Sequence, residues 1–225
     1  MREIPIIYED KFCIVFNKPA GLPVQGGEGI KLSLDSILSE KIRPRPFLVH
    51  RLDKETSGII LVAKTKEAAR LFSALFANTG AINKLYLALC SGNVKPEQGL
   101  ISLGLDIKQK GRFPVQKEAE TFYRCLSTVE AAGYSFSLLE LKLMTGRMHQ
   151  IRRHLAHIGN PVLGDDKYGD FSLNKKLKTA TGLKRLLLHA WRLVIPPLPE
   201  LVPDGLDVTA PLPDYFPAFE EISKI

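Results

Sequence analysis

Asp53 stands in a polar segment between two apolar stretches, with the cations Arg51 and Lys54 close to it in the sequence. Cationic neighbours favour the ionised form of a carboxylate. An ionised carboxylate suits a nucleophile better than a general acid. The same residues could instead form a salt bridge that holds a turn. Taken by itself, the segment therefore predicts either a nucleophile or a structural ion pair.

A second candidate group lies in the segment from Arg147 to Gly159. Four apolar residues recur there at helical spacing and predict a helix with one apolar stripe: Met148, Ile151, Leu155 and Ile158. Arg147 and Arg152 lie on the flanks of this stripe, whereas Arg153 points away from it. A half-buried arginine needs a partner. We therefore expect Arg152 to pair with a carboxylate and Arg153 to face water.

The same segment contains His149, His154 and His157, which raise the question of a metal site. The helical zinc signature requires histidines at positions i and i+4 with a nearby glutamate. The three histidines do not have that spacing, and arginines surround them. We therefore expect no metal site, and a core or RNA-facing role for the histidines.

Short strands and helices must position these residues. Apolar or alternating runs predict strands at 12–16, 47–49, 58–63, 85–89 and 134–143. The last run changes phase where Leu138 meets Leu139, which predicts a β-bulge. Ser33 and Thr65 are candidate N-caps of two helices. The proline-rich tail from Pro196 to Pro217 is expected to wrap the surface.

The composition limits the possible classes of protein. With 225 residues, 45% of them hydrophobic, the chain can bury a core, and we expect one domain. A net charge of +7 favours an anionic partner such as nucleic acid. Three cysteines without a CxxC motif argue against a disulfide scaffold or zinc knuckle and fit a reducing cytoplasm. No apolar run approaches the roughly 20 residues that cross a bilayer.

The string HRLDKETSG, from His50 to Gly58, resembles the signature of the RluA-type pseudouridine synthases. Further blocks that resemble motifs of that family follow in the family's order: Lys18–Gly21 lies before this string, and Lys84–Ala88, Thr145–Gly169 and Leu188–Ala190 lie after it. The resemblance covers roughly residues 10 to 195. One short motif could arise by chance, whereas this ordered set is specific.

The resemblance implies an α+β catalytic domain over residues 1–225. Its mixed, mainly antiparallel and bent sheet would be flanked by helices around a central RNA-binding cleft. No N-terminal S4-like module is expected. It implies an isomerase that detaches the uracil of a uridine in RNA from C1′, rotates it and rejoins it through C5. This chemistry needs no metal and no cofactor.

The resemblance also implies roles for individual residues. Asp53 would be the essential carboxylate, attacking C1′ of the ribose or C6 of the base, and a route through a glycal is equally consistent. Arg152 would pair with that carboxylate. Tyr86 would stack on the target uracil and help to remove the C5 proton. Leu188 would form an apolar wall of the uracil pocket.

Contacts to RNA are expected from four further residues. Arg51 would fill the gap left by the extruded nucleotide or hold it. Arg147 and Lys18 are candidates for phosphate contacts, and His50 is a further RNA-binding candidate. A later basic cluster either binds the RNA backbone or forms a solvated loop: Lys175, Lys176, Lys178, Lys184 and Arg185.

Two alternative functions remain at this point. A nucleoside or glycoside hydrolase would use a second carboxylate, for which Asp165 and Asp166 are candidates, and would release free uracil. A catalytically inactive RNA-binding module would bind RNA without forming product. For a synthase, both ribosomal RNA of the 23S type and transfer RNA remain open as substrates. We expect a cytoplasmic monomer.

Overall fold

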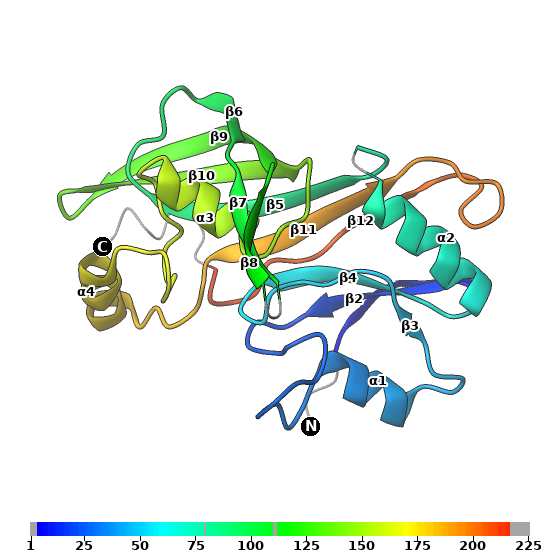
Figure 1. Cartoon of the computed structure of the whole chain (residues 1–225). Coiled ribbons are helices and arrows are strands. Elements are labelled where there is room, and N and C mark those ends of the chain that lie inside the picture. Colours follow the sequence, from blue (N-terminus) through cyan, green and yellow to red (C-terminus); the bar gives the residue numbers. More distant parts are fainter. Residues whose placement is uncertain (1–3, 79, 110–111, 217–225) are drawn as a thin grey trace. The chain divides into compact units, whose positions relative to one another are not determined.

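The computed structural model describes residues 4–78, 80–109 and 112–216, whose elements are drawn in Figure 1. The chain divides into two compact units. Unit 1 comprises Met1–Lys84 and His189–Pro213, and unit 2 comprises Leu85–Leu188 and Asp214–Ile225. Unit 1 is therefore built from two stretches that are far apart in the sequence. The single domain expected from the sequence stays a prediction.

Unit 1 contains a sheet of the strands β1 (Ile6–Glu9), β2 (Cys13–Lys18), β3 (Phe47–Leu48), β4 (Ser57–Ala63), β11 (Leu188–Ile195) and β12 (Leu206–Thr209). β2 lies between β1 and β4, β11 is the next neighbour of β4, β12 pairs with β11, and β3 pairs with β4. The pairing of β4 with β11 is parallel and sets His189 opposite Ser57, whereas the others are antiparallel. Every residue of β4 is buried, as expected of a strand covered on both faces.

The two helices of unit 1 begin at the caps that the sequence predicts. α1 (Leu34–Lys41) starts after Ser33, which forms a capping box with Ser36. α2 (Lys66–Ala77) starts after Thr65, whose side chain accepts a hydrogen bond from the backbone of Ala68. Ala68 and Phe72 of α2 are buried in the core formed with the strands of unit 1.

The tail that follows Pro196 does more than wrap the surface, so that prediction is wrong. It supplies β12, and five of its apolar residues belong to the core of unit 1: Leu201, Val202, Leu206, Val208 and Ala210. The last three alternate along the chain, which is the period of a strand with one buried face. The prolines around them hide this short pattern.

Unit 2 contains the strands β5 (Asn83–Ser91), β6 (Gln98–Ser102), β9 (Glu120–Ala131) and β10 (Tyr134–Leu143), together with a separate hairpin of β7 (Leu105–Gln109) and β8 (Arg112–Lys117). The first four form antiparallel pairs in the order β5, β10, β9 and β6. The register of β10 against β9 shifts between Leu138 and Leu139, which confirms the predicted bulge.

Both helices of unit 2 differ from the sequence prediction. α3 (Gln150–His157) begins later than expected because His149 has a left-handed backbone conformation, with φ at 54°. Met148 therefore leaves the apolar stripe and is 54% exposed, whereas Ile151 and Leu155 are buried as predicted. The sequence pattern misses α4 (Phe171–Thr181).

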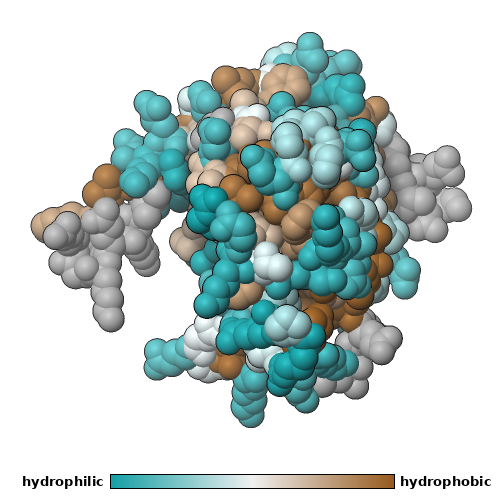
Figure 2. Space-filling model, turned by 90° about the vertical axis from the view of Figure 1, so that its right-hand side faces the viewer, coloured by the Kyte–Doolittle hydropathy of each residue, from teal (hydrophilic) through white to brown (hydrophobic). Residues whose placement is uncertain are grey.

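The described residues thus form a mixed, mainly antiparallel sheet arrangement with four helices, which confirms the predicted α+β class. Hydrophilic residues cover much of the face viewed in Figure 2, with hydrophobic residues exposed between them. None of the described helices is long and apolar enough to cross a membrane.

Candidate active site

Asp53 of unit 1 is half-buried and belongs to a tightly held turn. Its carbonyl accepts a hydrogen bond from the backbone of Thr56 at 3.2 Å. The carbonyl of the next residue, Lys54, accepts two, one from the Nζ atom of Lys18 at 3.2 Å and one from the backbone of Gly21 at 2.9 Å. The turn after β2 therefore fixes the backbone beside the candidate nucleophile.

Lys18 is fully buried. Besides Lys54, its Nζ atom donates to the carbonyls of Pro19 and Leu22, at 3.0 and 2.9 Å. Burial lowers the pKa of Lys18 to about 7, although the charges of Glu55 and Asp53 act to raise it. An amino group enclosed by three carbonyls is not placed to contact a phosphate, which corrects the predicted role of Lys18. Its hydrogen bonds give it a structural role instead.

His50 is half-buried and makes its contacts within unit 1. Its Nε2 atom accepts a hydrogen bond from the backbone of Leu61 at 2.9 Å, and its ring stacks on Phe76 at 4.0 Å between centroids. Burial lowers the pKa of His50 to about 3, and the charge of Lys84 adds to this effect. The neutral ring anchors the segment before Asp53 against α2. The RNA contact predicted for His50 stays a prediction.

Sequence reasoning missed the pair of side chains behind this segment. The hydroxyl of Ser57 lies 2.9 Å from Nδ1 of His189, and both groups are buried. Gly58, with φ at 109°, packs so closely on β11 that a Cβ atom there would lie 2.2 Å from the carbonyl oxygen of Ala190. The only signal in the sequence was the occurrence of Ser-Gly and His-Ala within two of the matched motifs.

Arg152 of unit 2 is 4% exposed. Its Nε and Nη2 atoms donate to the two carboxylate oxygens of Asp165 at 2.7 and 2.6 Å, and Nη2 also lies 3.3 Å from Asp166. This two-point contact confirms that Arg152 pairs with a carboxylate. The partner is Asp165, which sequence reasoning offered only as a hydrolase residue. Pairing of Arg152 with Asp53 stays a prediction.

The Asp165 carboxylate is held from several sides. Burial acts to raise its pKa, but the hydrogen bonds from Arg152 and from the backbones of Tyr168 and Lys167 outweigh burial and lower it. The ring of Tyr168 packs under the guanidinium, 5.2 Å from its centre, and its hydroxyl lies 3.1 Å from Nδ1 of His149. Such a carboxylate stays ionised and orients Arg152; it is unsuited to the general acid of a hydrolase.

Gln150 is buried and fixes the turn before α3. Its side-chain oxygen accepts hydrogen bonds from the hydroxyl of Thr145 at 2.7 Å and from the backbone of Arg147 at 2.9 Å. Its amide nitrogen donates to the carbonyl of Glu120 at 2.8 Å. This side chain explains why the backbone before residue 150 is not helical. The phosphate contact predicted for Arg147, which is half-buried, stays a prediction.

The remaining predicted residues lie in contrasting surroundings. Arg51 is exposed in unit 1. Tyr86 on β5 and Leu188 at the start of β11 are 8% and 3% exposed. Arg153 does not simply face water, because it is half-buried and its Nη1 atom donates to the carbonyl of Asp106 at 3.3 Å. The low exposure of Tyr86 and Leu188 does not test their expected contacts with the uracil, which stay predictions.

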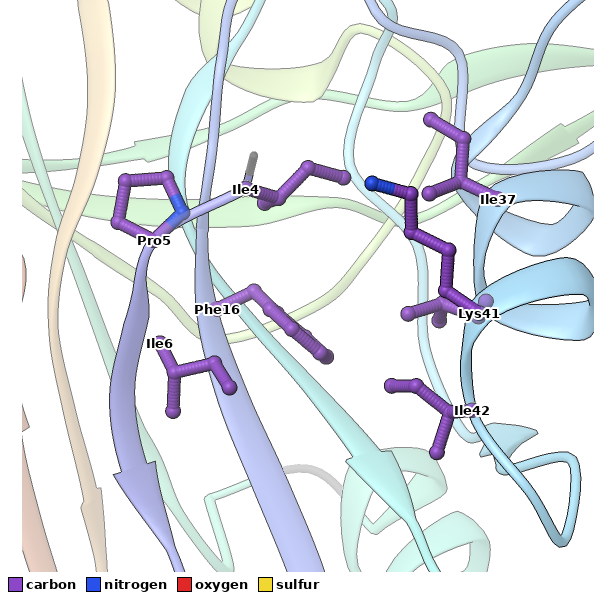
Figure 3. Close-up of a pocket in the computed structure, with 8 residues that line it drawn as sticks. Ile4, Pro5, Ile6, Phe16, Ile37, Lys41 and Ile42 are labelled. Atoms are coloured by element: carbon purple, nitrogen blue, oxygen red, sulfur yellow. The ribbon is translucent and has the colours of Figure 1, made fainter. Parts of the chain in front are cut away.

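A separate cavity of about 520 Å³ lies in unit 1 between α1 and the first two strands (Figure 3). Its lining is apolar except for Lys41, whose amino group extends toward Ile4. None of the residues predicted for the active site lines it. In the described part of the chain, no cluster of three or more His, Cys, Asp or Glu side chains could hold a metal ion.

The motifs and the fold agree with comparison to known proteins. A model of the RNA pseudouridylate synthase family matches residues 12–157, and the chain belongs to this family. It is therefore an RNA pseudouridine synthase, an isomerase whose partner is RNA. The resemblance to the RluA-type enzymes is confirmed by its curated relatives.

Three relatives illustrate the similarity. The chain is 38% identical over 204 residues to a tRNA pseudouridine synthase C of Haemophilus ducreyi, covering 84% of this chain and 83% of that one. It is 37% identical over 221 residues to a ribosomal large subunit pseudouridine synthase C of Rickettsia bellii, covering 94% and 69%. The solved structure of human RNA pseudouridylate synthase domain containing 4 superposes with a TM-score of 0.75 at 29% identity, covering 94% and 89%.

Proposed function

We propose that Asp53 is the essential carboxylate of this synthase. The observation that carries this assignment is the double hydrogen bond to the carbonyl of Lys54, which fixes the backbone next to Asp53 through Lys18 and Gly21. A carboxylate that extends from a fixed backbone has fewer positions from which to meet a reacting carbon, which favours nucleophilic attack. Attack at C1′, attack at C6 and a glycal route all remain compatible with this position.

Arg152 and Tyr86 are proposed to act with Asp53. Arg152 presents a guanidinium that Asp165 and Tyr168 hold in one orientation, so it can stabilise a second anion without rearranging. Tyr86 is proposed to stack on the uracil and to assist loss of the C5 proton, and Leu188 to form an apolar wall for the base. These assignments rest on the matched motifs.

Arg51 is proposed to contact the extruded nucleotide. Its side chain is exposed and lies two residues before Asp53, whereas the neighbouring His50 is turned inward onto Phe76. An exposed guanidinium can stack on a base or bind a phosphate when the target nucleotide leaves the helix. Arg147 is proposed to bind phosphate.

The substrate is proposed to be a ribosomal RNA or a transfer RNA. The relatives described above are named for one or the other substrate. The enzyme is proposed to work as a monomer in the cytoplasm. It is also proposed to need no metal or organic cofactor, because isomerisation neither consumes nor releases another reactant. Pseudouridine mapping in total RNA from cells with and without the gene would identify the site that depends on this enzyme.

The test of the proposal compares Asp53→Asn with the surface variant Asp35→Asn. Asp35 is a matched control because it is a carboxylate of the same unit, paired with Arg45 at the surface. The assay measures tritium released from ribosomal and transfer RNA labelled at C5 of uridine. We expect Asp53→Asn to abolish release with RNA affinity within a few-fold of the parent, and Asp35→Asn to retain activity. Full activity of Asp53→Asn would overturn the assignment.

The same labelled RNA separates the two alternatives when free uracil is measured beside the released tritium. Release of free uracil by the parent protein would support a hydrolase. Tight RNA binding with neither tritium nor uracil released, on RNA from cells lacking the gene, would support an inactive binding module.

A further inference from the structure

The outward face of α4 combines two lysines with an exposed aromatic ring. Phe171, Lys175 and Lys178 are spaced four and three residues apart, so they lie on one side of the helix. The opposite side carries Leu173 and Leu177, which are buried. All three outward residues are exposed, and Phe171 is 61% exposed.

We propose that this outward face of α4 is a docking surface for the RNA substrate, with Lys175 and Lys178 at phosphates and Phe171 against a base. The proposal rests on the RNA chemistry described above and adds a binding surface outside the matched catalytic motifs. Lysines interleaved with an exposed aromatic ring are the combination that binds single-stranded nucleic acid, since the cations contact the backbone while a base stacks on the ring.

The charge pattern around α4 supports an anionic partner. No Asp or Glu occurs from Phe171 to Pro199, although this stretch carries three lysines on α4 and also Lys184 and Arg185. Among the described residues, neither Lys175 nor Lys178 forms an ion pair with a carboxylate. Within the described part of the chain, Lys175 and Lys178 therefore keep their positive charge without an ion pair, and this charge can attract phosphates over about a Debye length.

The helix is anchored firmly enough to present this face in a fixed orientation. Asp170 caps its N-terminus by accepting a hydrogen bond from the backbone of Leu173 at 2.9 Å. Asn174 accepts a bond from the backbone of Gly164 and donates to the carbonyl of Asp165, both at 2.9 Å. Because Asp165 also holds Arg152, RNA bound on α4 would be attached to the same rigid part of unit 2 as the candidate catalytic arginine.

Lys176 behaves differently and is not part of the proposed surface. Its Nζ atom lies 2.6 Å from the hydroxyl of Tyr134 and 5.3 Å from the centre of that ring. Lys176 already contacts Tyr134 within unit 2. Replacing it would disturb that contact as well as remove a charge, so it is left unchanged in the test.

The experiment compares three variants of the full chain with the parent. Lys175→Gln/Lys178→Gln removes the two cations, and Phe171→Ala removes the ring. Lys66→Gln/Arg70→Gln is the matched control, because it removes two exposed cations from one face of α2 and changes the net charge equally. The probe is fluorescently labelled bulk bacterial transfer RNA, and its affinity is measured by anisotropy at several salt concentrations.

We expect the α4 double variant to bind roughly tenfold more weakly and to reduce the slope of log K against log salt by about 1.5. Phe171→Ala should weaken binding with little change in that slope, because a ring contributes stacking rather than charge. The α2 control should bind as the parent does. Thermal unfolding of all variants should be unchanged because the altered side chains are exposed.

Parent-like affinity and slope in the α4 double variant would overturn the proposal, as would an equal loss in the α2 control. Ultraviolet cross-linking to the same RNA gives an independent reading, with cross-linked peptides expected to include 171–178. Failure of the parent to release tritium, with weaker RNA binding by the α4 variants, would reject the proposed chemistry but not the surface. Normal tritium release by the parent, with parent-like RNA binding by the α4 variants, would reject the surface but not the chemistry.

Discussion

The hydroxyl of Ser57 and the Nδ1 atom of His189 lie 2.9 Å apart, although the two residues are separated by 132 positions in the chain. Nε2 of His189 lies 3.4 Å from the carbonyl of Ala210, which can only accept. The ring therefore carries its proton on Nε2, and Nδ1 accepts from Ser57. A neutral imidazole thus joins β4 to β11 directly after the segment that bears Asp53.

Replacement of Ser57 by alanine should destabilise the protein. The variant leaves the buried Nδ1 atom of His189 without its donor, which costs roughly 1–3 kcal/mol of unfolding free energy. Urea denaturation measures this loss. The control is Ser73→Ala on the exposed face of α2, expected to change stability by no more than about 0.5 kcal/mol. Equal effects of the two variants would show that the hydroxyl–imidazole bond contributes nothing.

Gly58→Ala should be more damaging still. Its backbone has φ at 109° and its Cβ would meet the carbonyl of Ala190 at 2.2 Å, so β4 and β11 would have to separate. We expect a loss on the order of 3 kcal/mol, measured by thermal unfolding, and a fall in turnover. Gly26→Ala is the control, because a Cβ there meets nothing within 4 Å. A parent-like melting temperature for Gly58→Ala would contradict the close approach of the two strands.

The two adjacent aspartates at the end of the third motif should behave differently. Asp165→Ala leaves the buried guanidinium of Arg152 without its main partner, which costs about 3–5 kcal/mol. Asp166→Ala removes a side chain that is 84% exposed and should cost less than about 1 kcal/mol. Chemical denaturation of both variants provides the comparison, and Asp165→Asn serves where the alanine variant does not fold. A larger loss of unfolding free energy for Asp166→Ala than for Asp165→Ala would show that Asp165 is not the main partner of Arg152.

Arg152→Lys should reduce kcat far more than Arg153→Lys. A lysine at 152 cannot reproduce the two-point contact with Asp165, so the positive charge would lose its orientation. The hydrogen bond from Arg153 to the carbonyl of Asp106 is long, at 3.3 Å, and uses one guanidinium nitrogen. Steady-state tritium release separates kcat from KM for both variants, and similar kcat values would refute the role of Arg152.

Acid should destabilise the protein through its buried histidines. Burial lowers the pKa of His154 to about 4, and the charge of Arg153 adds to the effect. The unfolded chain binds a proton below about pH 6.5 and the folded chain does not, so stability is present above that pH and falls as the pH drops toward 4. We expect His154→Leu to flatten this fall by up to about 1.4 kcal/mol per pH unit.

The control for the pH experiment is His157→Leu, which removes an exposed imidazole from the same helix. Its stability should fall with acid nearly as steeply as that of the parent, because the charge of His157 lowers the pKa of His154 less than burial does. Urea titrations at closely spaced pH values between 4.5 and 7 give the slopes, and an unchanged slope in His154→Leu would show that His154 does not stay neutral in the folded state.

The elements that the sequence predicts correctly are those whose signal is local. Ser33 and Thr65 cap helices because their side chains satisfy nearby backbone donors, and the phase change at Leu138 marks a bulge within one strand. The sequence pattern does not predict α4, because only Leu173 and Leu177 show helical apolar spacing in an otherwise polar stretch. Its caps, Asp170 and Gly182, were the available signal.

The candidate site shows the same limit. The position of Arg152 on the helix predicts that it pairs with a carboxylate. Which carboxylate it pairs with depends on the turn that places Asp165 next to α3. Likewise, the family resemblance suggested Lys18 as a phosphate ligand, and only the fold reveals that its amino group is enclosed by carbonyls. Tertiary pairing of this kind leaves no periodic trace in the sequence.

The discontinuity of unit 1 has a consequence for biosynthesis. His189 and Ala190 pair with Ser57 and Gly58, so the start of β4 lacks this neighbour until the ribosome has delivered β11. A nascent chain that ends before β11 lacks the strand that pairs with β4 directly after the segment bearing Asp53, and it leaves backbone donors and acceptors of β4 open to other chains. Chemical competence of this enzyme should therefore appear only after β11 has been synthesised.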